Sequence, residues 1–221
     1  MPVRALAHTV KNKVLSALAF TAKSSIEAPD AAFLALFGAT PSISGASVTP
    51  QSAMGVPAVA AAVTLISDAV GTLPAKLFTN LGDGGKEPDT KHSAYALVHD
   101  DANEWTSASQ LRGQLTADAL LYGNGYAFAN RIGGRVVELI RLDPETVKPH
   151  VNKTTGEPSF IVKEGRTTRT YPFQDILHIP AFTGTDGITG IAPIHFAREA
   201  IALSIVLETH AARLFGRGGR P

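Results

Sequence analysis

The spacing of hydrophobic residues after position 50 predicts two helices ahead of a run of strands. Behind Pro57 the apolar residues recur at intervals of four, three and four, at Val59, Val63, Ile66 and Val70. This spacing predicts a helix that buries that face and is closed by Gly71. A short strand is expected over 75–79. The next helix is expected from an N-cap at Thr106 to about Tyr122.

From Gly123 onward the hydrophobic period becomes that of strands. Gly133–Gly134 separates two alternating runs, which predicts a hairpin over 125–142. Further strands are expected over 146–151, 159–163, 167–171 and 175–179. A glycine-rich loop over 184–190 leads to a helix over Pro193–Phe215. The pattern therefore predicts an α+β domain: a mostly antiparallel sheet with packed helices and a long C-terminal helix.

Composition and charge exclude several classes of protein. The 221-residue chain has 20 Lys+Arg against 19 Asp+Glu, and its formal net charge of +1 excludes a strongly basic nucleic-acid binder and an acidic solvating protein. With no cysteine, the chain holds no disulfide, thiolate zinc site or cysteine nucleophile. Charged residues make up 18%, below the roughly 25% of soluble domains, which favours a surface that meets other surfaces. No apolar run approaches the roughly 20 residues of a membrane helix.

Residues 1–50 differ in character from the rest of the chain. Short apolar pieces alternate there with Ser, Thr, Gly and Pro, which is typical of a partly disordered tail that becomes ordered on a partner. The alternative is an N-terminal helix packed on the domain. Residues 51–221 are expected to form the α+β domain itself.

The glycine-rich segments indicate turns and caps instead of a nucleotide site. The segment Gly123–Gly125 follows a helix and opens a strand, whereas a phosphate loop precedes a helix, so it is predicted to be a helix C-cap. The motif GxxxxGK[ST] is absent, which excludes a P-loop ATPase. In the loop over 184–190, Gly187 and Gly190 are expected to adopt backbone angles that other residues avoid. The change Gly190→Val is expected to lower stability and redirect the last helix.

Two pairs of titratable residues are candidates for chemistry. His195 and Glu199 lie four residues apart on the predicted last helix and could hold one metal ion, but no third ligand is near in sequence, so a solvated surface pair is favoured. Asp175 and His178 could form a catalytic pair, but GxSxG is absent. A hydrogen-bonded structural histidine is therefore favoured.

The remaining candidates lie in loops or at the chain end. Adjacent Asp100 and Asp101 would point to opposite sides of a strand and make a poor acid–base pair, so they are assigned to a polar loop. Trp105 is a candidate platform for a stacked base, with a packing role before the N-cap favoured. A basic cluster at the chain end is a candidate for nucleic-acid contact, with solvated arginines as the alternative. It comprises Arg213, Arg217 and Arg220.

An ordered series of short motifs runs through residues 44–221. Its members are the segments 44–53, 59–74, 121–127 (LYGNGYA), 138–144 (ELIRLDP), 175–179 (DILHI), 187–193 (GITGIAP) and 213–221. In this order and at these spacings they resemble the HK97-type portal proteins of tailed bacteriophages. The resemblance implies the wing-like α/β region that leads toward the stem, with the clip and crown regions expected beyond Pro221.

The resemblance also implies a structural subunit of a phage or prophage and not an enzyme, with no catalytic residues, cofactor or metal. Such proteins form a ring, usually a dodecamer, at one capsid vertex, and double-stranded DNA is packaged and ejected through it. The implied partners are further copies of the chain, the terminase large subunit that hydrolyses ATP, and capsid and head–tail connector proteins, with no membrane. The implied place is the portal vertex of the virion, after assembly in the bacterial host cytoplasm.

Two other hypotheses from the residues stay open at this point. One is a monomeric module that binds another protein. The other is a small hydrolase that uses Asp175 and His178 with the loop over 184–190.

Overall fold

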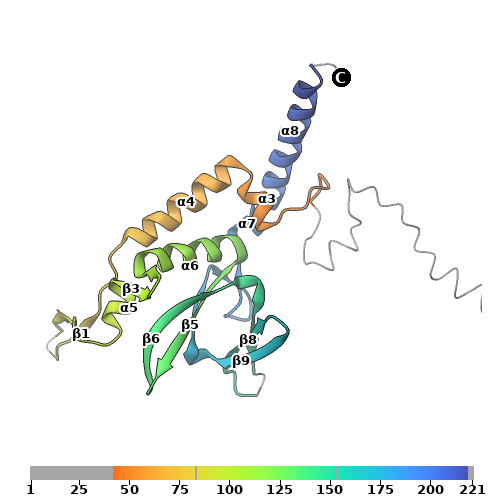
Figure 1. Cartoon of the computed structure of the whole chain (residues 1–221). Helices are drawn as coiled ribbons and strands as arrows, with labels where there is room; N and C mark the ends of the chain where they lie inside the picture. Colours follow the sequence, from red (N-terminus) through yellow and green to blue (C-terminus); the bar gives the residue numbers. More distant parts are fainter. Residues whose placement is uncertain (1–41, 83, 153, 219–221) are drawn as a thin grey trace, which may run out of the picture. The chain divides into compact units, whose positions relative to one another are not determined.

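The computed structural model describes residues 42–82, 84–152 and 154–218 (Figure 1). The chain divides into two units, residues 1–41 and 42–221, and the described residues all belong to the second unit. Most of the tail expected over 1–50 therefore lies outside the described residues. Among the described residues, no helix is long and apolar enough to span a membrane.

Helices form the first part of the domain. They are α3 (Pro50–Met54), α4 (Pro57–Thr72), α5 (Tyr95–His99) and α6 (Ala108–Tyr122). The hydroxyl of Ser107 accepts a hydrogen bond from the Gln110 amide at 3.1 Å and caps α6. The predicted cap at Thr106 is therefore wrong by one residue. At the other end, Gly123 has a φ of 87° and is the left-handed C-cap, so that prediction is confirmed.

The strands pair only in antiparallel fashion among the described residues, which confirms the predicted α+β class. The main sheet has the order β10 (Ile176–Pro180), β5 (Asn124–Ile132) and β6 (Arg135–Leu142). The second has the order β7 (Val147–Val151), β8 (Pro158–Glu164) and β9 (Thr167–Pro172). The predicted hairpin turn at Gly133 and Gly134 is confirmed, with φ values of 59° and 82°.

Short strand pairs complete the fold. They are β1 (Phe78–Asn80) with β2 (Lys86–Pro88), β3 (Asp101–Asn103) with β4 (Thr106–Ser107), and β11 (Phe182–Thr183) with β12 (Gly190–Ile191). The strand expected over 75–79 is thus displaced toward residue 80. The loop expected over 184–190 is the turn of the β11–β12 pair.

Two apolar clusters hold the helices and sheets together. One lies between the two sheets and contains Tyr126, Val147, Phe160, Val162 and Ile176. The other joins α6 to β5 and contains Ala102, Leu111, Leu115 and Ala127. Strand β5 contributes Tyr126 to the first cluster and Ala127 to the second, so it packs against both the second sheet and α6.

Helix α4 does not bury the face that its apolar spacing predicts. The buried positions are Val63, Ser67 and Gly71, whereas Ile66 and Val70 are exposed. Ser67 can be buried because its hydroxyl donates to the Val63 carbonyl at 2.7 Å. At Gly71 an added Cβ would lie 3.1 Å from the Ser109 carbonyl oxygen, so α4 and α6 pack closely through small residues. Gly71 lies inside the helix, which ends at Thr72.

The predicted C-terminal helix is broken into two. Helix α7 (Pro193–Phe196) is followed by Ala197, whose ψ of 5° departs from helical geometry, and then by α8 (Arg198–Gly216). Ile194 before this break and Ile201 after it pack in one apolar cluster. The apolar spacing in the sequence therefore runs across the break without indicating it. The pattern therefore predicts a single continuous helix where the structure has a bend.

Candidate assembly interface

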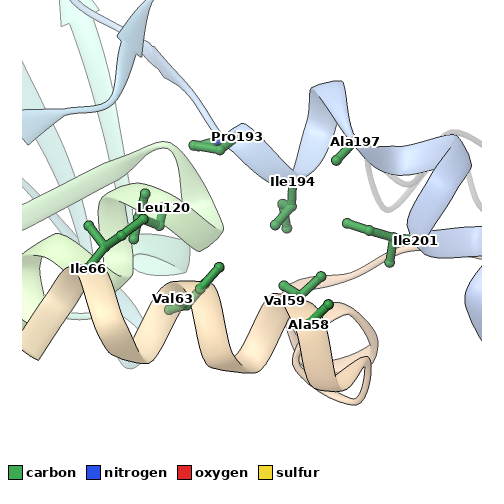
Figure 2. Close-up of a pocket in the computed structure, with 10 residues that line it drawn as sticks. Ala58, Val59, Val63, Ile66, Leu120, Pro193, Ile194, Ala197 and Ile201 are labelled. Carbon is green, nitrogen blue, oxygen red and sulfur yellow. The ribbon is translucent and has the colours of Figure 1, made fainter.

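An apolar groove of about 270 Å³ lies between α4, the end of α6 and the α7–α8 bend (Figure 2). Figure 2 shows Val59 and Val63 of α4 on one side and Ile194 on the other. Its lining is entirely aliphatic: Ala58, Val59, Ala62, Val63, Ile66, Leu120, Pro193, Ile194, Ala197 and Ile201. Such a lining supplies no polar group that could orient a substrate, so the groove suits an apolar side chain of another protein.

The segment before α4 fixes one end of this groove. Thr49 and Ser52 form a capping box around α3, with the Ser52 amide donating to the Thr49 hydroxyl at 3.1 Å. Ala53 and Val56 then pack on Ile201 of α8. This small cluster sets the base of α8 against the start of α4.

Beside the groove, helix α4 exposes an apolar face. Of its sixteen residues one is charged, Asp68. Leu65 is 72% exposed, and Ile66, Val70 and the following Leu73 are also exposed. An exposed helix normally carries charged residues on its outer side, so this face is typical of a surface that another protein covers.

Helix α8 is apolar on more than one side. Ile201 and Ala202 are buried at its start. Farther along, the exposed apolar residues are Leu203, Val206, Leu207 and Phe215. Within the described part of the chain these side chains have no cluster to pack against, so they add to the unpartnered apolar surface.

An aromatic group is exposed near the bend. Phe182 of β11 and Phe196 of α7 meet edge to face with ring centroids 5.8 Å apart, and both are exposed.

Trp105 is 69% exposed, so its favoured assignment as a packing residue is wrong. Its backbone amide donates to the Asn103 side chain at 3.1 Å, which holds a tight turn and leaves the ring outside the core.

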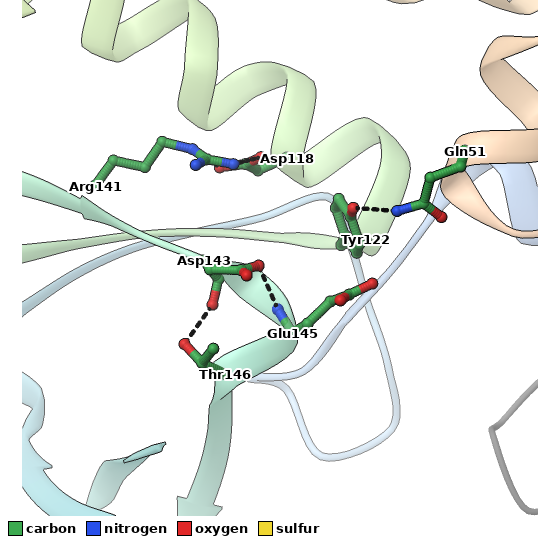
Figure 3. Close-up of polar contacts among 7 residues, drawn as sticks. All are labelled: Gln51, Asp118, Tyr122, Arg141, Asp143, Glu145 and Thr146. Atoms are coloured by element: carbon green, nitrogen blue, oxygen red, sulfur yellow. Dashed lines mark hydrogen bonds and ion pairs between the residues drawn. The ribbon is translucent and has the colours of Figure 1, made fainter. Parts of the chain in front are cut away.

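An ion pair with a buried carboxylate joins α6 to β6 (Figure 3). Arg141 donates from Nε and Nη2 to the two oxygens of Asp118, at 2.7 and 2.6 Å. The Asp118 side chain is 6% exposed and that of Arg141 39%. Burial raises the pKa of Asp118, although the pair with Arg141 opposes this rise. The hydrogen bond to Asp118 raises the pKa of Arg141, so the guanidinium stays charged.

Near this pair, Tyr122 links α6 to α3. Its hydroxyl accepts a hydrogen bond from Gln51 Nε2 at 3.2 Å (Figure 3). Burial raises the pKa of Tyr122, and the carboxylates of Glu145 and Asp143 raise it further. Asp143 itself accepts from the Glu145 amide at 3.1 Å and shapes a turn. These contacts are structural and assemble no acid–base pair.

Asp175 and His178 do not form a catalytic pair. Asp175 accepts from Arg131 Nε at 3.3 Å, in the turn before β10. His178 Nε2 donates to the Asn124 side-chain oxygen at 2.9 Å, and its ring stacks on Tyr126 with centroids 4.8 Å apart. Burial lowers the pKa of His178. The prediction of a structural histidine is confirmed, and the hydrolase hypothesis loses its catalytic pair.

His195 and Glu199 do not share one helix, because the break at Ala197 separates them. Glu199 accepts from the Ile43 amide at 2.9 Å and from Arg198 Nη2 at 3.3 Å. The shared-face geometry on which the metal hypothesis depended is therefore wrong. Within residues 42–218, where described, no group of three or more His, Cys, Asp or Glu could hold a metal ion.

The remaining candidates lie apart from one another. Asp100 is the C-cap residue of α5 and pairs with His99 at 2.8 Å, and Asp101 begins β3. Arg213 is exposed in the last turn of α8, and Arg217 is its exposed C-cap. Arg220 lies outside the described residues.

The exposed apolar face of α4 was not predicted from the sequence. The presence of one charged residue among the sixteen of this helix could have indicated it.

Comparisons with known proteins give this surface a context. The family profile described as "Phage portal protein" matches residues 57–221. The probable portal protein of Streptomyces phage phiC31 is 29% identical over 80% of this chain, and the portal protein of Enterobacteria phage HK97 is 24% identical over 79%. The chain spans 40% and 41% of the length of these curated relatives.

Solved structures show the same fold. A chain in the neck of an empty gene transfer agent (GTA) particle, computed with C6 symmetry, has a TM-score of 0.66 at 22% identity, and the match covers 83% of this chain and 50% of that one. An HK97-family phage portal protein from Corynebacterium diphtheriae has a TM-score of 0.53 at 17% identity, with 76% and 50% covered. Since the profile match extends over most of the chain, this protein belongs to the phage portal protein family.

Proposed function

We propose that this protein is a portal subunit of a phage or prophage. Copies of the chain assemble into a closed ring at one capsid vertex, and double-stranded DNA is packaged and ejected through the ring. Membership of the portal family is the observation that carries the proposal. The proposed partners are the terminase large subunit and the capsid and head–tail connector proteins. The proposed place is the virion, after assembly in the host cytoplasm.

The exposed apolar surface supports assembly with other copies. Leu65 on α4 and Leu207 on α8 are both more than half exposed, at 72% and 58%. Monomeric soluble proteins rarely leave such residues in contiguous patches. One matched neck structure, that of the native GTA particle, was computed with C12 symmetry, which favours a dodecamer as the ring.

The near-neutral net charge supports a channel through which DNA passes without being tightly bound. The formal net charge is +1, and each Lys or Arg contact to phosphate adds salt-dependent affinity, so a channel with few contacts lets DNA slide. Arg213 and Arg217, exposed at the end of α8, are the proposed DNA contacts, together with Arg220. The proposed role is structural and uses no cofactor.

Mass photometry and negative-stain electron microscopy of the purified chain, over a series of protein and salt concentrations, test the proposal. Closed rings with a central hole are expected. A chain that stays monomeric under all of these conditions would contradict the proposal and favour a monomeric protein-binding module.

A further inference from the structure

We propose that α8 of a second copy of this chain docks on the apolar face of α4, beside the groove. The inference rests on the proposed ring, in which each subunit must present two unlike surfaces to its two neighbours. We define the α4 face by Ala62, Leu65, Ile66 and Ala69, and the α8 ridge by Leu203, Leu207 and Leu214.

The α4 face has the shape that a helix requires of its partner. Ala62, Leu65 and Ala69 follow at intervals of three and four, so they form one stripe along α4. The two alanines let another backbone approach closely, while Leu65 projects between them. The groove of about 270 Å³ continues this stripe toward the α7–α8 bend, since Ala62 and Ile66 line it. The face is therefore hollowed at the end where the groove lies, while Leu65 is exposed beside it.

The α8 ridge joins no core cluster within the described residues: Leu203 and Leu207 are exposed, and Leu214 is half-buried. Leu203, Leu207 and Leu214 follow at intervals of four and seven, so they also form one stripe. Ile205 is the last residue of α8 that packs against a core cluster within the described part of the chain. Beyond it the ridge carries Leu207 and Leu214, with the exposed His210 between them on the same face, and another molecule can cover this surface.

Charges beside the two stripes are opposite in sign. Asp68 lies three residues after Leu65 and is the charged residue of α4. Arg217 lies three residues after Leu214, at the end of α8. Glu199, one turn before Leu203, already accepts hydrogen bonds from Ile43 and Arg198. An acidic position therefore borders the α4 face and an exposed basic position borders the α8 ridge, which favours contact between unlike faces over contact between two α4 faces.

The two surfaces do not meet within one copy of the chain. Within one copy, α4 and α8 meet at their bases, where Val56, Val59 and Ile201 form a cluster. Leu65 and Leu207 lie beyond that cluster on their helices, and both remain exposed. Docking between two copies covers both surfaces at once, in the head-to-tail manner that a ring needs.

Cysteine cross-linking tests the docking directly, because the chain has no cysteine of its own. Ala69→Cys marks the α4 face and Ala211→Cys the α8 ridge, and both changes leave the leucines in place. The two variants, carrying different affinity tags, are co-expressed and treated with a short bismaleimide. We expect a cross-linked species that holds both tags, several-fold above that of a control pair in which Thr168→Cys on β9 replaces Ala211→Cys.

The outcomes separate the docking from the proposed function. Rings that form without the mixed cross-link, or with cross-links only between two Ala69→Cys copies, overturn the docking and leave the portal proposal standing. A parent chain that never self-associates overturns both.

Exchanging the charges of Asp68 and Arg217 tests the docking independently. Asp68→Lys and Arg217→Glu are each expected to weaken self-association by about twofold to fivefold, the range of an exposed ion pair. The double variant is expected to recover the affinity of the parent chain. Losses that simply add in the double variant would overturn the pairing of these two faces.

Discussion

The side-chain amide of Asn124 hydrogen-bonds both backbone groups of Gly190. Its Oδ1 accepts from the Gly190 amide at 2.8 Å, and its Nδ2 donates to the Gly190 carbonyl at 3.1 Å. The same oxygen accepts from His178 Nε2 at 2.9 Å. Asn124 begins β5, and Gly190 begins the short strand that leads to α7. One buried side chain therefore fixes the point from which the chain departs toward α8.

Replacing Asn124 is expected to destabilise the domain strongly. Asn124→Ala leaves the Gly190 amide and carbonyl without these partners in a buried place, at a cost of about 2–4 kcal/mol in the free energy of unfolding. Asn130→Ala is the matched control: Asn130 lies on the same strand and donates to Glu138 at 2.8 Å on the hairpin. It should cost about 1 kcal/mol or less. Urea unfolding of both variants measures the difference, and equal losses would contradict the role of Asn124.

Two glycines of the β11–β12 turn are expected to differ in their tolerance of alanine. Gly187 has a φ of 71° but open space around it, so Gly187→Ala should cost about 1–2 kcal/mol in backbone strain. At Gly190 a Cβ would overlap the Gly123 carbonyl oxygen and lie 2.9 Å from the Ala181 amide. Gly190→Ala should therefore cost more and alter the departure of α7. Thermal unfolding ranks the two, and a milder effect at Gly190 would count against this close approach.

The prediction of positive φ at both glycines is thus half right. Gly187 has the left-handed backbone, whereas Gly190 is needed because two backbone segments nearly touch there. A sequence shows that a glycine is present, but it does not distinguish a special dihedral angle from a lack of space. That distinction depends on Gly123, which is 67 positions earlier in the chain.

Local signals in the sequence were sufficient for much of the fold. The hairpin at Gly133–Gly134 and the C-cap at Gly123 follow from backbone preferences of a few neighbouring residues, so they could be predicted. The inward face of α4 could not, because close packing against α6 selects Ser67 and Gly71 over larger residues. The break at Ala197 was equally hidden, since the apolar period runs through it. The candidate interface depends on these tertiary features. The sequence therefore predicted the family but not the exposed apolar face of α4.

Breaking the ion pair between α6 and β6 is expected to have unequal effects from its two sides. Arg141→Gln leaves the Asp118 carboxylate buried without its partner, at a cost of about 3 kcal/mol. Asp118→Asn removes the buried charge, and Arg141, 39% exposed, can be hydrated, so about 1 kcal/mol is expected. Urea unfolding at neutral pH compares the two, and equal losses would show that the buried carboxylate is not the source of the cost.

The stability deficit of Arg141→Gln should also depend on pH. Burial raises the pKa of Asp118 above its ordinary value of 3.8, and loss of Arg141 removes the group that opposes this rise. The folded variant then binds a proton at a pH where the unfolded chain does not, so acid favours its folded state. The deficit relative to the parent chain is expected to be full at neutral pH and to shrink as the pH falls toward 3.8. A deficit that stays constant over this range would contradict the raised pKa.

His178 is expected to make the domain less stable in mild acid. Burial lowers its pKa below the ordinary 6.5, so the unfolded chain takes up a proton near pH 6.5 while the folded chain does not. The contribution of His178 is full above that pH and is lost as the pH falls toward the folded-state pKa.

His178→Phe keeps the stacking on Tyr126 and removes the titration, and Asn124 still accepts from Gly190. Its unfolding free energy should therefore fall less below pH 6.5 than that of the parent chain. His150→Phe, at an exposed position of β7, is the control for the loss of one histidine. Identical pH profiles for His178→Phe and the parent chain would place the acid sensitivity elsewhere.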